Sequence, residues 1–507
     1  MVFMSATVQP LSLMSTSPHG GDSKFPVPEP RLSGVKAALR YTGIPPSWLD
    51  KRPSIPSRNW LIFIGVTSTI TGWYIYDRRQ CKNIRQEYVD KVKHLSEVPL
   101  HSLDYPRKVT VYGSKWPGDE DSDRSLRYFR KYVKPVLVAA AVDFEMIKGR
   151  RHGELADRIA NEIRARRRID LGIDPPPPSV MLLHNTNMEA KRKRELEGGI
   201  VIVGRSTFKE FMNGLKRGWT EGLDKVDKEE KLSRELETDG RFDEPVEPEM
   251  TVDVGSLDGE PLPTPSKLPP SRNGFSPFSA PHLRPQTSTA DPRTSTENSI
   301  PSNLNTPPEK IAPVPPILLV NYVNHIGLAQ IPNMIWEFFN ERHKVRSGAE
   351  AAYKLISNET RPFVGPSNPA REFVADDQTT SPAKPFPSEI QPDPTDLDFG
   401  KDAEAWYKNS TVKNFASDIQ KARDEYYKEL PKKLETARAL ARGVREPTKD
   451  EVNYPPPTEV EIRAERMKKE LRWRSDEAGW EVIKPEREAD WDDRFDGVLK
   501  VFVEPSS

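Results

Sequence analysis

Residues 60–76 form an uncharged stretch in a chain in which 30% of the residues are charged. As a helix, this stretch would rise roughly 25 Å, at the short end of what crosses the hydrocarbon core of a bilayer. Its strongly apolar members each favour insertion by about 0.3–0.6 kcal/mol, and no central charge opposes them. These members are Leu61, Ile62, Phe63, Ile64, Val66, Ile70 and Ile75. The pattern predicts one transmembrane helix at residues 60–76, after a flexible arm at residues 1–59. A buried core helix is the alternative.

Two sets of residues in and beside this stretch are candidates for contacts in the membrane. Aromatic residues and arginines at its ends are predicted to anchor it at the membrane–water interfaces, where such side chains concentrate. They are Arg58, Trp60, Trp73, Tyr76, Arg78 and Arg79. The second set shares one helix face by its spacing, and small residues there would let two membrane helices approach closely. It consists of Gly65, Ser68, Thr69 and Gly72. The competing interpretation is that the hydroxyl groups bond back to their own helix.

Apolar residues then recur every three or four positions from Cys81 to Leu95. This spacing predicts a juxtamembrane helix at residues 77–98 with one apolar face. Cys81 is the only cysteine, so the chain can form neither an internal disulfide nor a cysteine-based zinc site.

Short apolar runs alternate with helix-like segments over residues 108–224 and again over residues 313–360. The runs predict strands at residues 108–112, 135–142, 199–204 and 317–323. The other segments predict helices at residues 122–134, 152–168 and 331–341, and a further helix whose start carries Thr207 and Glu210 at capping-box spacing. This alternation predicts an α/β domain with a mainly parallel sheet and covering helices.

Two stretches rich in proline, serine and threonine lack apolar periodicity, and both are predicted to be disordered linkers, at residues 225–312 and 361–399. Residues 400–507 are highly charged and predicted to be mainly helical. The apolar positions with helical spacing are Phe415, Ile419, Ala422, Tyr426 and Leu430, followed by Val460, Ala464, Met467 and Leu471. A terminal strand at residues 498–503 could complete the sheet.

An α/β sheet raises the question of a phosphate-binding loop. Gly113 and Gly118 have the spacing of such a loop, but the residues that follow are Asp119, Glu120 and Asp121, which would repel a phosphate instead of binding it. After the third strand, Gly204 could open a helix that holds one anion, although a helix cap is the more common role. The eight histidines form no pair at metal-ligand spacing. No catalytic, cofactor-binding or metal residues are therefore predicted. The 76 basic and 76 acidic residues cancel, and nothing in this balance points to nucleic acid.

Several short motifs resemble the fungal Tim fifty-four family, the fifty-four-kilodalton subunit of the mitochondrial inner-membrane carrier translocase. The motifs are Gly43-Ile-Pro-Pro46, Pro56-Ser-Arg-Asn-Trp-Leu-Ile-Phe63, Tyr76-Asp-Arg-Arg79, Tyr128-Phe-Arg-Lys-Tyr-Val-Lys-Pro135, Asp143-Phe144, Gly198-Gly-Ile-Val201 and Gly479-Trp-Glu-Val-Ile483. The similarity covers roughly residues 43–225, 313–360 and 400–507. The run that begins at Pro56 is the most specific of these motifs.

The resemblance implies a non-catalytic scaffold subunit, anchored once in the inner membrane, that supports the insertion of multispanning carrier proteins. It further implies that the subunit stabilises the pore-forming assembly and offers a docking surface to the small Tim chaperones of the intermembrane space. A link to the assembly of the i-AAA protease belongs to the same expectation. The alternative is a membrane-tethered α/β enzyme acting on a nucleotide or lipid, which only the strand–helix alternation supports.

Charge does not decide the orientation in the membrane. Four Lys or Arg residues lie within twenty residues before the predicted anchor and six within twenty after it. This bias opposes the usual rule for a translocated C-terminal side. The expectation of an N-terminus in the matrix and a C-terminal domain in the intermembrane space therefore follows from the resemblance alone.

Overall fold

The computed structural model describes residues 57–99, 106–175, 186–225, 227–243, 300–301, 304–366 and 395–505. Most of the predicted arm and most of both predicted linkers lie outside these residues. The chain divides into two compact units, Met1–Thr71 and Gly72–Ser507. Helix α3 (Arg58–Ser96) runs without a break across this division. The remaining elements all belong to the second unit.

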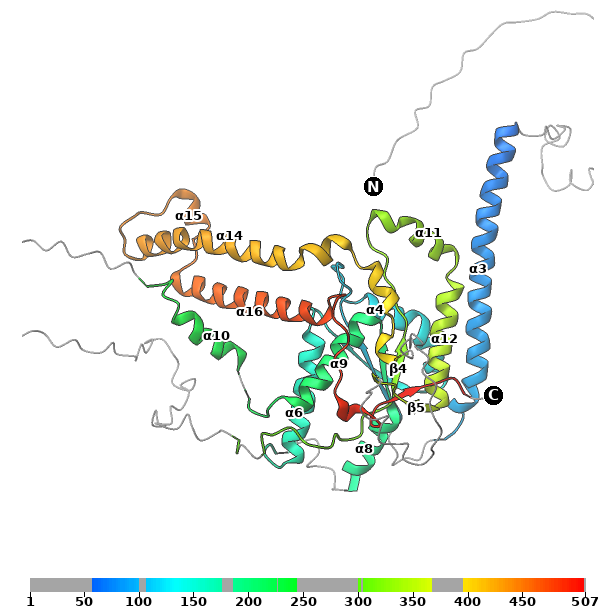
Figure 1. The fold of residues 1–507 in the computed structure, drawn as a ribbon. Coiled ribbons are helices and arrows are strands. Elements are labelled where there is room, and N and C mark those ends of the chain that lie inside the picture. Colours follow the sequence, from blue (N-terminus) through cyan, green and yellow to red (C-terminus); the bar gives the residue numbers. More distant parts are fainter. Residues whose placement is uncertain are drawn as a thin grey trace, which may run out of the picture. The chain divides into compact units, whose positions relative to one another are not determined.

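A six-stranded sheet forms the centre of the second unit, with the order β2-β1-β3-β4-β6-β5 (Figure 1). Its strands are β1 (Lys108–Gly113), β2 (Asp143–Lys148), β3 (Ile200–Val203), β4 (Ile317–Val320), β5 (Thr360–Pro362) and β6 (Lys500–Phe502). All neighbouring strands pair in parallel except β5 and β6. The prediction of a mainly parallel sheet is confirmed, and the C-terminal strand completes it as expected.

Helices cover both faces of this sheet because alternate strand residues are buried on opposite sides. Val109, Val111 and Val201 belong to one apolar core, together with side chains of the second half of α3, of α4 (Arg124–Tyr128), of α5 (Lys134–Ala139) and of α12 (Arg342–Ser357). Tyr112 and Ile202 belong to the other core, together with α6 (Glu154–Asp170) and α9 (Arg205–Thr220). Successive side chains of each strand point to opposite faces of the sheet and therefore pack into two separate cores.

The prediction of a strand at residues 135–142 is wrong. These residues continue from α4 through a π-helical turn, Phe129–Val133, into α5, and the strand β2 follows only at Asp143. Val136 and Leu137 are fully buried in the core that α12 covers. A short apolar run is compatible with a buried helix as well as a strand, and here the helix prevails. β2 escaped prediction because it is an edge strand with mostly exposed side chains.

Two further details of the α/β region differ from the prediction. β4 ends at Val320, three residues earlier than expected. Thr207 and Glu210 form no capping box, because α9 begins earlier and its N-cap residue is Gly204. Both side chains bond elsewhere. Thr207 Oγ1 donates to Val203 O, and Glu210 accepts from Leu155 N. The other predicted helices are confirmed as α4, α6 and α11 (Ile331–Phe339).

The C-terminal region contains a pair of long helices, α14 (Asn409–Ala441) and α16 (Glu459–Ile483), which lie side by side in Figure 1 and share an apolar core. Tyr426 and Leu430 are buried there as predicted. The face predicted for α16 is wrong, since Val460 is 76% exposed and the buried line contains Arg466 and Glu470 instead. These charged residues are buried because Asp239 pairs with the former and Tyr427 donates to the latter.

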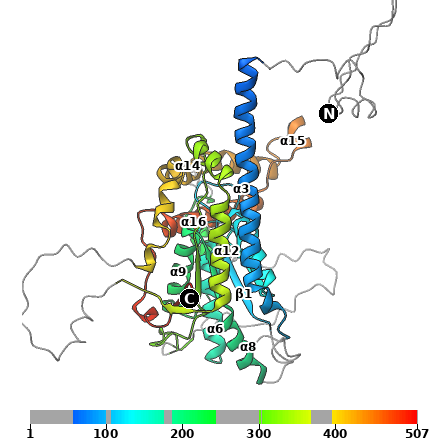
Figure 2. The same cartoon turned by 90° about the vertical axis from the view of Figure 1, so that its right-hand side faces the viewer.

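Helix α10 (Lys228–Glu237) packs against α16, although it falls in the segment predicted as a linker. Buried Leu232 and a salt bridge from Arg474 to Glu235 (2.6 Å) hold it there. Shorter elements complete the described chain: α8 (Thr186–Gly198), α15 (Lys449–Asn453) and the 3-10 turns Leu328–Gln330, Asp396–Asp398, Lys401–Trp406 and Asp493–Phe495. Figure 2 shows the sheet region from the side, with α12 alongside α3.

Candidate functional site

The crevice at the carboxyl ends of β1 and β3 is where a doubly wound sheet would bind a nucleotide, because the strand order reverses there. In this chain hydroxyl groups bridge the two loops directly. Ser114 N donates to Thr207 Oγ1 (2.9 Å), and Ser114 Oγ donates to Ser206 Oγ (3.0 Å). Buried Trp116 packs edge-on against Tyr322 and Tyr407 just beyond them. The polar groups of these two loops thus bond to each other, at the place where a nucleotide-binding loop would present them to a phosphate.

The acidic residue that stands in place of a phosphate-binding lysine has a structural role. Asp119 is buried and accepts from Arg124 (2.9 Å) and Asn324 (2.7 Å). After β3, Arg205 points to the segment around residues 397–404, where it donates to Phe399 O (3.1 Å) and to Glu404 (2.7 Å). Both loops are therefore committed to internal contacts.

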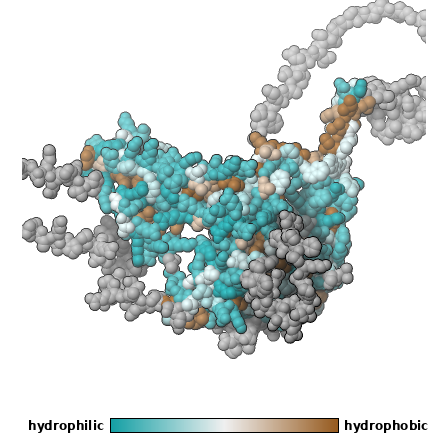
Figure 3. All heavy atoms as spheres, in the orientation of Figure 1, coloured by the Kyte–Doolittle hydropathy of each residue, from teal (hydrophilic) through white to brown (hydrophobic). Residues whose placement is uncertain are grey.

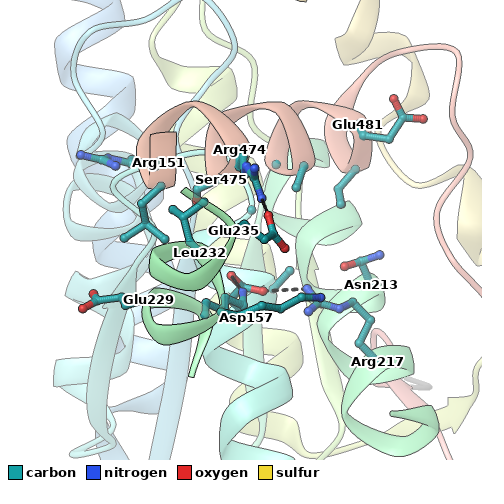
Figure 4. Close-up of a pocket in the computed structure, with 18 residues that line it drawn as sticks. Arg151, Asp157, Asn213, Arg217, Glu229, Leu232, Glu235, Arg474, Ser475 and Glu481 are labelled. Carbon is teal, nitrogen blue, oxygen red and sulfur yellow. Dashed lines mark hydrogen bonds and ion pairs between the residues drawn. The ribbon is translucent and has the colours of Figure 1, made fainter. Parts of the chain in front are cut away.

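A cavity of about 800 Å³ lies between α6 and α9 on one side and α10 and α16 on the other (Figure 4). Charged groups on each side are paired, Arg217 with Asp157 (2.7 Å) and Arg474 with Glu235 (2.6 Å). Lys228 of α10 reaches across the cavity to Asp157 (2.8 Å). His152 lies beside it on the loop before α6, and burial lowers its pKa to about 3, so it stays uncharged. The cavity thus lies at the joint between the α/β layer and the helical pair, and ion pairs line it.

Glu210 on α9 is a second buried group beside this joint. Its Oε2 accepts from Leu155 N at the start of α6 (3.1 Å), while its Oε1 has no partner. Burial raises its pKa to about 8. Glu210 is therefore protonated at neutral pH and bridges α6 and α9 as a neutral acid.

We expect this buried acid to make stability depend on pH. The pKa of Glu210 is higher in the folded than in the unfolded protein. Its contribution to the free energy of unfolding is therefore greatest below about pH 4.5 and is lost as the pH rises towards about 8. Glu210→Gln keeps the shape without the titration. The difference in unfolding free energy between Glu210→Gln and the natural protein should therefore shift in favour of the variant by on the order of 2 kcal/mol between pH 6 and pH 8.5. The melting temperature of the variant should rise relative to that of the natural protein over the same range.

Glu162→Gln, on the exposed side of α6, is the matched control. Thermal melting of the detergent-solubilised chain at several pH values provides the measurement. A constant difference between Glu210→Gln and the natural protein across this range would show that Glu210 does not titrate there.

The second half of α3 is joined to the sheet domain by one buried carboxylate. Asp77 is fully buried and accepts from Glu341 N (3.1 Å) and Arg342 N (3.3 Å), the free amides at the start of α12. Anionic side chains are favoured at this position because a helix N-terminus carries partial positive charge. Asp77 therefore caps α12 across 265 residues of sequence.

The next residue, Arg78, strengthens the same junction. It forms a salt bridge with Glu341, which is buried and also accepts from Tyr132 Oη (2.7 Å). The Arg78 guanidinium lies 4.9 Å from the centroid of the Tyr74 ring. Aromatic rings of α3 and α11 then stack beyond it, Trp73 on Phe339 (5.6 Å) and Tyr74 on Phe338 (5.4 Å). The motif that begins at Tyr76 thus encodes a helix junction.

The predicted interface anchors have different surroundings in the structure. Arg58 opens α3, Trp60 is 59% exposed, and Arg79 is exposed. Trp73 and Arg78 belong to the junction described above, and Tyr76 lies under the Arg342 guanidinium (5.8 Å). These three side chains therefore contact the protein itself, which the sequence did not indicate.

The small residues of the predicted contact face are exposed on α3. A Cβ atom added at Gly65 or Gly72 would meet nothing within 4 Å. Thr69 Oγ1 donates to Gly65 O (2.9 Å), the back-bonding that was the competing interpretation for this hydroxyl. Among the residues that the structure describes, no helix combines the length and apolar character required of a membrane span. The described part of the chain also has no group of three or more His, Cys, Asp or Glu side chains arranged to hold a metal ion.

Sequence reasoning missed Glu341 and the exposed apolar face of α11. Glu341 is distant from its partners in sequence, and no local pattern marks it. The sequence predicts Ile331–Phe339 as part of a helix that covers the sheet, whereas none of its residues is buried. The described residues therefore form an α/β protein in which a charge network around Asp77 joins the second half of α3 to the sheet domain. The loops after β1 and β3 bond to each other.

Comparison with known proteins gives the family. Residues 36–436 match the family model described as "Inner membrane protein import complex subunit Tim54". A relative from Cryptococcus neoformans, named as mitochondrial import inner membrane translocase subunit TIM54, is 38% identical over 94% of this chain and 95% of its own length. Relatives of the same name from Candida albicans (28% identical; 66% and 86%) and Aspergillus oryzae (31%; 62% and 67%) are also similar.

The chain belongs to the Tim54 family of the mitochondrial inner membrane import machinery. This confirms the resemblance drawn from the short motifs, and it agrees with a location at the mitochondrial inner membrane. The named relatives are subunits of the mitochondrial inner membrane import translocase.

Proposed function

We propose that this protein is a non-catalytic scaffold subunit of the inner-membrane translocase that inserts multispanning carrier proteins. In this role it holds the membrane-embedded and soluble parts of the complex in register. The observation that carries the proposal is helix α3. Residues 60–76 expose a continuous series of large apolar side chains, and Asp77 and Arg78 directly afterwards fasten the helix to the sheet domain.

A helix of this kind could anchor the protein in the membrane and also position the soluble domain relative to it. The exposed apolar side chains are Trp60, Leu61, Ile62, Phe63, Ile64, Val66, Ile70, Trp73, Tyr74, Ile75 and Tyr76. Exposed apolar surface on this scale is rare in a protein surrounded by water, and it is explained if residues 60–76 lie in the bilayer as a single span. The large second unit would then serve as the surface for partners.

Those partners follow from the family and remain part of the proposal. They are the other translocase subunits including the pore-forming one, the small Tim chaperones, and the i-AAA protease. We place the N-terminus in the matrix and the C-terminal domain in the intermembrane space. The alternative, an enzyme acting on a nucleotide, finds no support at the ends of β1 and β3, where the two loops bond to each other.

The orientation can be tested with protease. Added to mitochondria whose outer membrane has been ruptured, it should digest the domain that follows residue 76, while intact mitochondria protect it. An antibody against the C-terminal region reports the outcome, and a matrix protein serves as the control for an intact inner membrane. Survival of the domain in ruptured mitochondria would place it in the matrix and contradict the proposed orientation.

The face of Gly65, Ser68, Thr69 and Gly72 is proposed to pack against another membrane subunit. Replacing Gly65, Ser68 and Gly72 by leucine should block close approach while making the helix more apolar. Added side chains at both glycines have room on the chain itself. We expect the triple variant to resist alkaline extraction and yet to leave the native complex on a non-denaturing gel.

The control replaces two residues on the opposite face of the same helix, Thr67 and Thr71, by leucine, which also makes the helix more apolar but leaves the small-residue face unfilled. If the variant at the small residues stays in the complex at the natural level, the soluble domain holds the assembly together. The proposed role of this face would then be wrong.

A further inference from the structure

Helix α11 presents its apolar side chains to solvent, unlike the other amphipathic helices of the sheet domain. None of its residues is buried. The exposed apolar side chains of α11 and the turn before it are Leu328, Ile331, Met334, Ile335, Trp336 and Phe338, with exposed fractions from 41% to 86%. Figure 3 shows hydrophobic residues gathered over α11 on a surface that is otherwise mostly hydrophilic. Such a face requires an occupant.

The protein holds this helix in a fixed place. Trp336 packs edge-on against Trp73 (5.8 Å), Phe339 stacks on the same indole (5.6 Å), and Phe338 stacks on Tyr74 (5.4 Å). Arg78 Nη2 donates to Phe338 O at the end of α11 (3.3 Å). One side of α11 is therefore anchored to aromatic residues of α3, and its Ile331–Ile335 side remains without a partner among the described residues.

A basic pocket of about 560 Å³ borders the same helix. Its lining carries the basic side chains Arg78, Arg124, Arg127, Lys131 and Lys344 and the carboxylates Glu337 and Glu341. Each basic side chain pairs with one carboxylate, either one of these two or Asp119 or Asp121. Arg124, Arg127 and Lys131 nevertheless stay 43–63% exposed to solvent, where an anion can reach them. Burial, and after it the neighbouring cations Arg78, Lys344 and Arg85, lower the pKa of Lys131 although Lys131 also contacts Glu341. Met334 and Phe338 of α11 line the same pocket. An apolar face and a cationic pocket thus share one edge.

Aromatic and aliphatic side chains beside clustered Lys and Arg form the pattern by which helices lie in the interface of an anionic membrane. We propose that α11 is a membrane-surface helix. Its Ile331–Ile335 face would lie among the acyl chains, and its basic pocket would meet the phosphates of anionic phospholipid headgroups. This second contact with the bilayer rests on the proposed membrane location of the protein, and it would fix the tilt of the sheet domain on the membrane. A second copy of the chain is the competing occupant.

The single cysteine allows a direct test in the full-length protein. Cys81→Ala removes the only thiol, and Ile335→Cys, at a 54% exposed position of α11, then accepts an environment-sensitive fluorophore. Val460→Cys on α16, 76% exposed, is the matched control, and Val66→Cys reports on the proposed anchor. Each labelled protein is reconstituted into vesicles of phosphatidylcholine with or without phosphatidylglycerol, each containing lipid brominated on its acyl chains as the quencher.

We expect the label at position 335 to be quenched severalfold more than the label at position 460, and more strongly when phosphatidylglycerol is present. Adding Ile331→Glu should reduce the quenching at position 335. Adding Arg127→Gln and Lys344→Gln should remove its dependence on phosphatidylglycerol. Unchanged melting temperatures for these variants show that the effect is local.

Equal, weak quenching at positions 335 and 460 would overturn the proposal. A label at position 335 that is shielded from water but not quenched by brominated lipid would also overturn it, and would identify a second copy as the occupant. The label at position 66 separates the two hypotheses. If it is quenched and position 335 is not, the anchor stands and the role of α11 is wrong, whereas absence of quenching at both positions contradicts both.

Discussion

Replacing Gly479 by alanine is expected to displace helix α16 and to lower the melting temperature by roughly 5 °C, from a loss of about 2–3 kcal/mol. Gly479 lies where α16 crosses the start of α6, and a Cβ atom there would overlap the carbonyl oxygen of His152. Gly153 approaches from the other side, since its own Cβ would come within 2.6 Å of the Gly479 Cα. Two backbones touch here, so no flexible side chain can yield.

The sign of this effect makes the prediction specific. In an open helix, alanine is favoured over glycine by about 1 kcal/mol, so Gly479→Ala would stabilise α16 if the crossing were loose. Ser475→Ala, one turn earlier on the same helix and at the wall of the cavity in Figure 4, is the control. Thermal melting followed by tryptophan fluorescence is informative because Trp480 stacks on Phe415 next to the crossing (4.7 Å). A melting temperature equal to or above that of Ser475→Ala would contradict the close approach.

The local sequence pattern predicted those elements correctly in which the spacing of apolar residues matches the buried positions. The run from Ile200 to Val203 is apolar at every position and is a central parallel strand, buried on both faces as such strands are. Cys81, Ile84 and Val92 lie on the buried side of α3 as their spacing indicated. Local pattern failed at residues 135–142, where the choice between helix and strand depends on the surrounding helices, and at β2, whose edge position leaves little apolar signal.

The sites depend on contacts that no short pattern contains. Buried Arg466 and Glu470 define the inner face of α16, although charged residues normally mark an outer face. Their partners Asp239 and Tyr427 lie on other elements. The opposite holds for α11, since this apolar helix was predicted to cover the sheet and is exposed instead. In both cases the residue type is known from the sequence, but the tertiary contacts determine whether the side chain is buried or exposed.

The junction that fastens α3 depends on the same kind of distant contact, through Asp77 and the amides of Glu341 and Arg342. Asp77→Ala would remove a helix cap and leave one buried and one partly buried amide group without this acceptor, a loss of about 2–3 kcal/mol at the junction. Asp77→Asn keeps an acceptor oxygen without the charge and should have a smaller effect. The junction holds the second half of α3 against α12. We therefore expect local opening of this junction to be more frequent in Asp77→Ala than in the natural protein.

Cys81 reports this opening, because it lies one turn beyond Asp77, is 7% exposed, and its thiol donates to Asp77 Oδ2 (3.7 Å). Burial, and then the Asp77 carboxylate, raise the pKa of the Cys81 thiol in the natural protein, so both protection and low thiolate content suppress its reaction. Asp77→Ala should therefore speed labelling of Cys81 by a soluble thiol reagent roughly tenfold or more. Asp90→Ala, on the exposed side of α3, should leave the rate unchanged. If Cys81 reacts equally slowly in Asp77→Ala, the cap contributes little and other contacts join the long helix to the sheet domain.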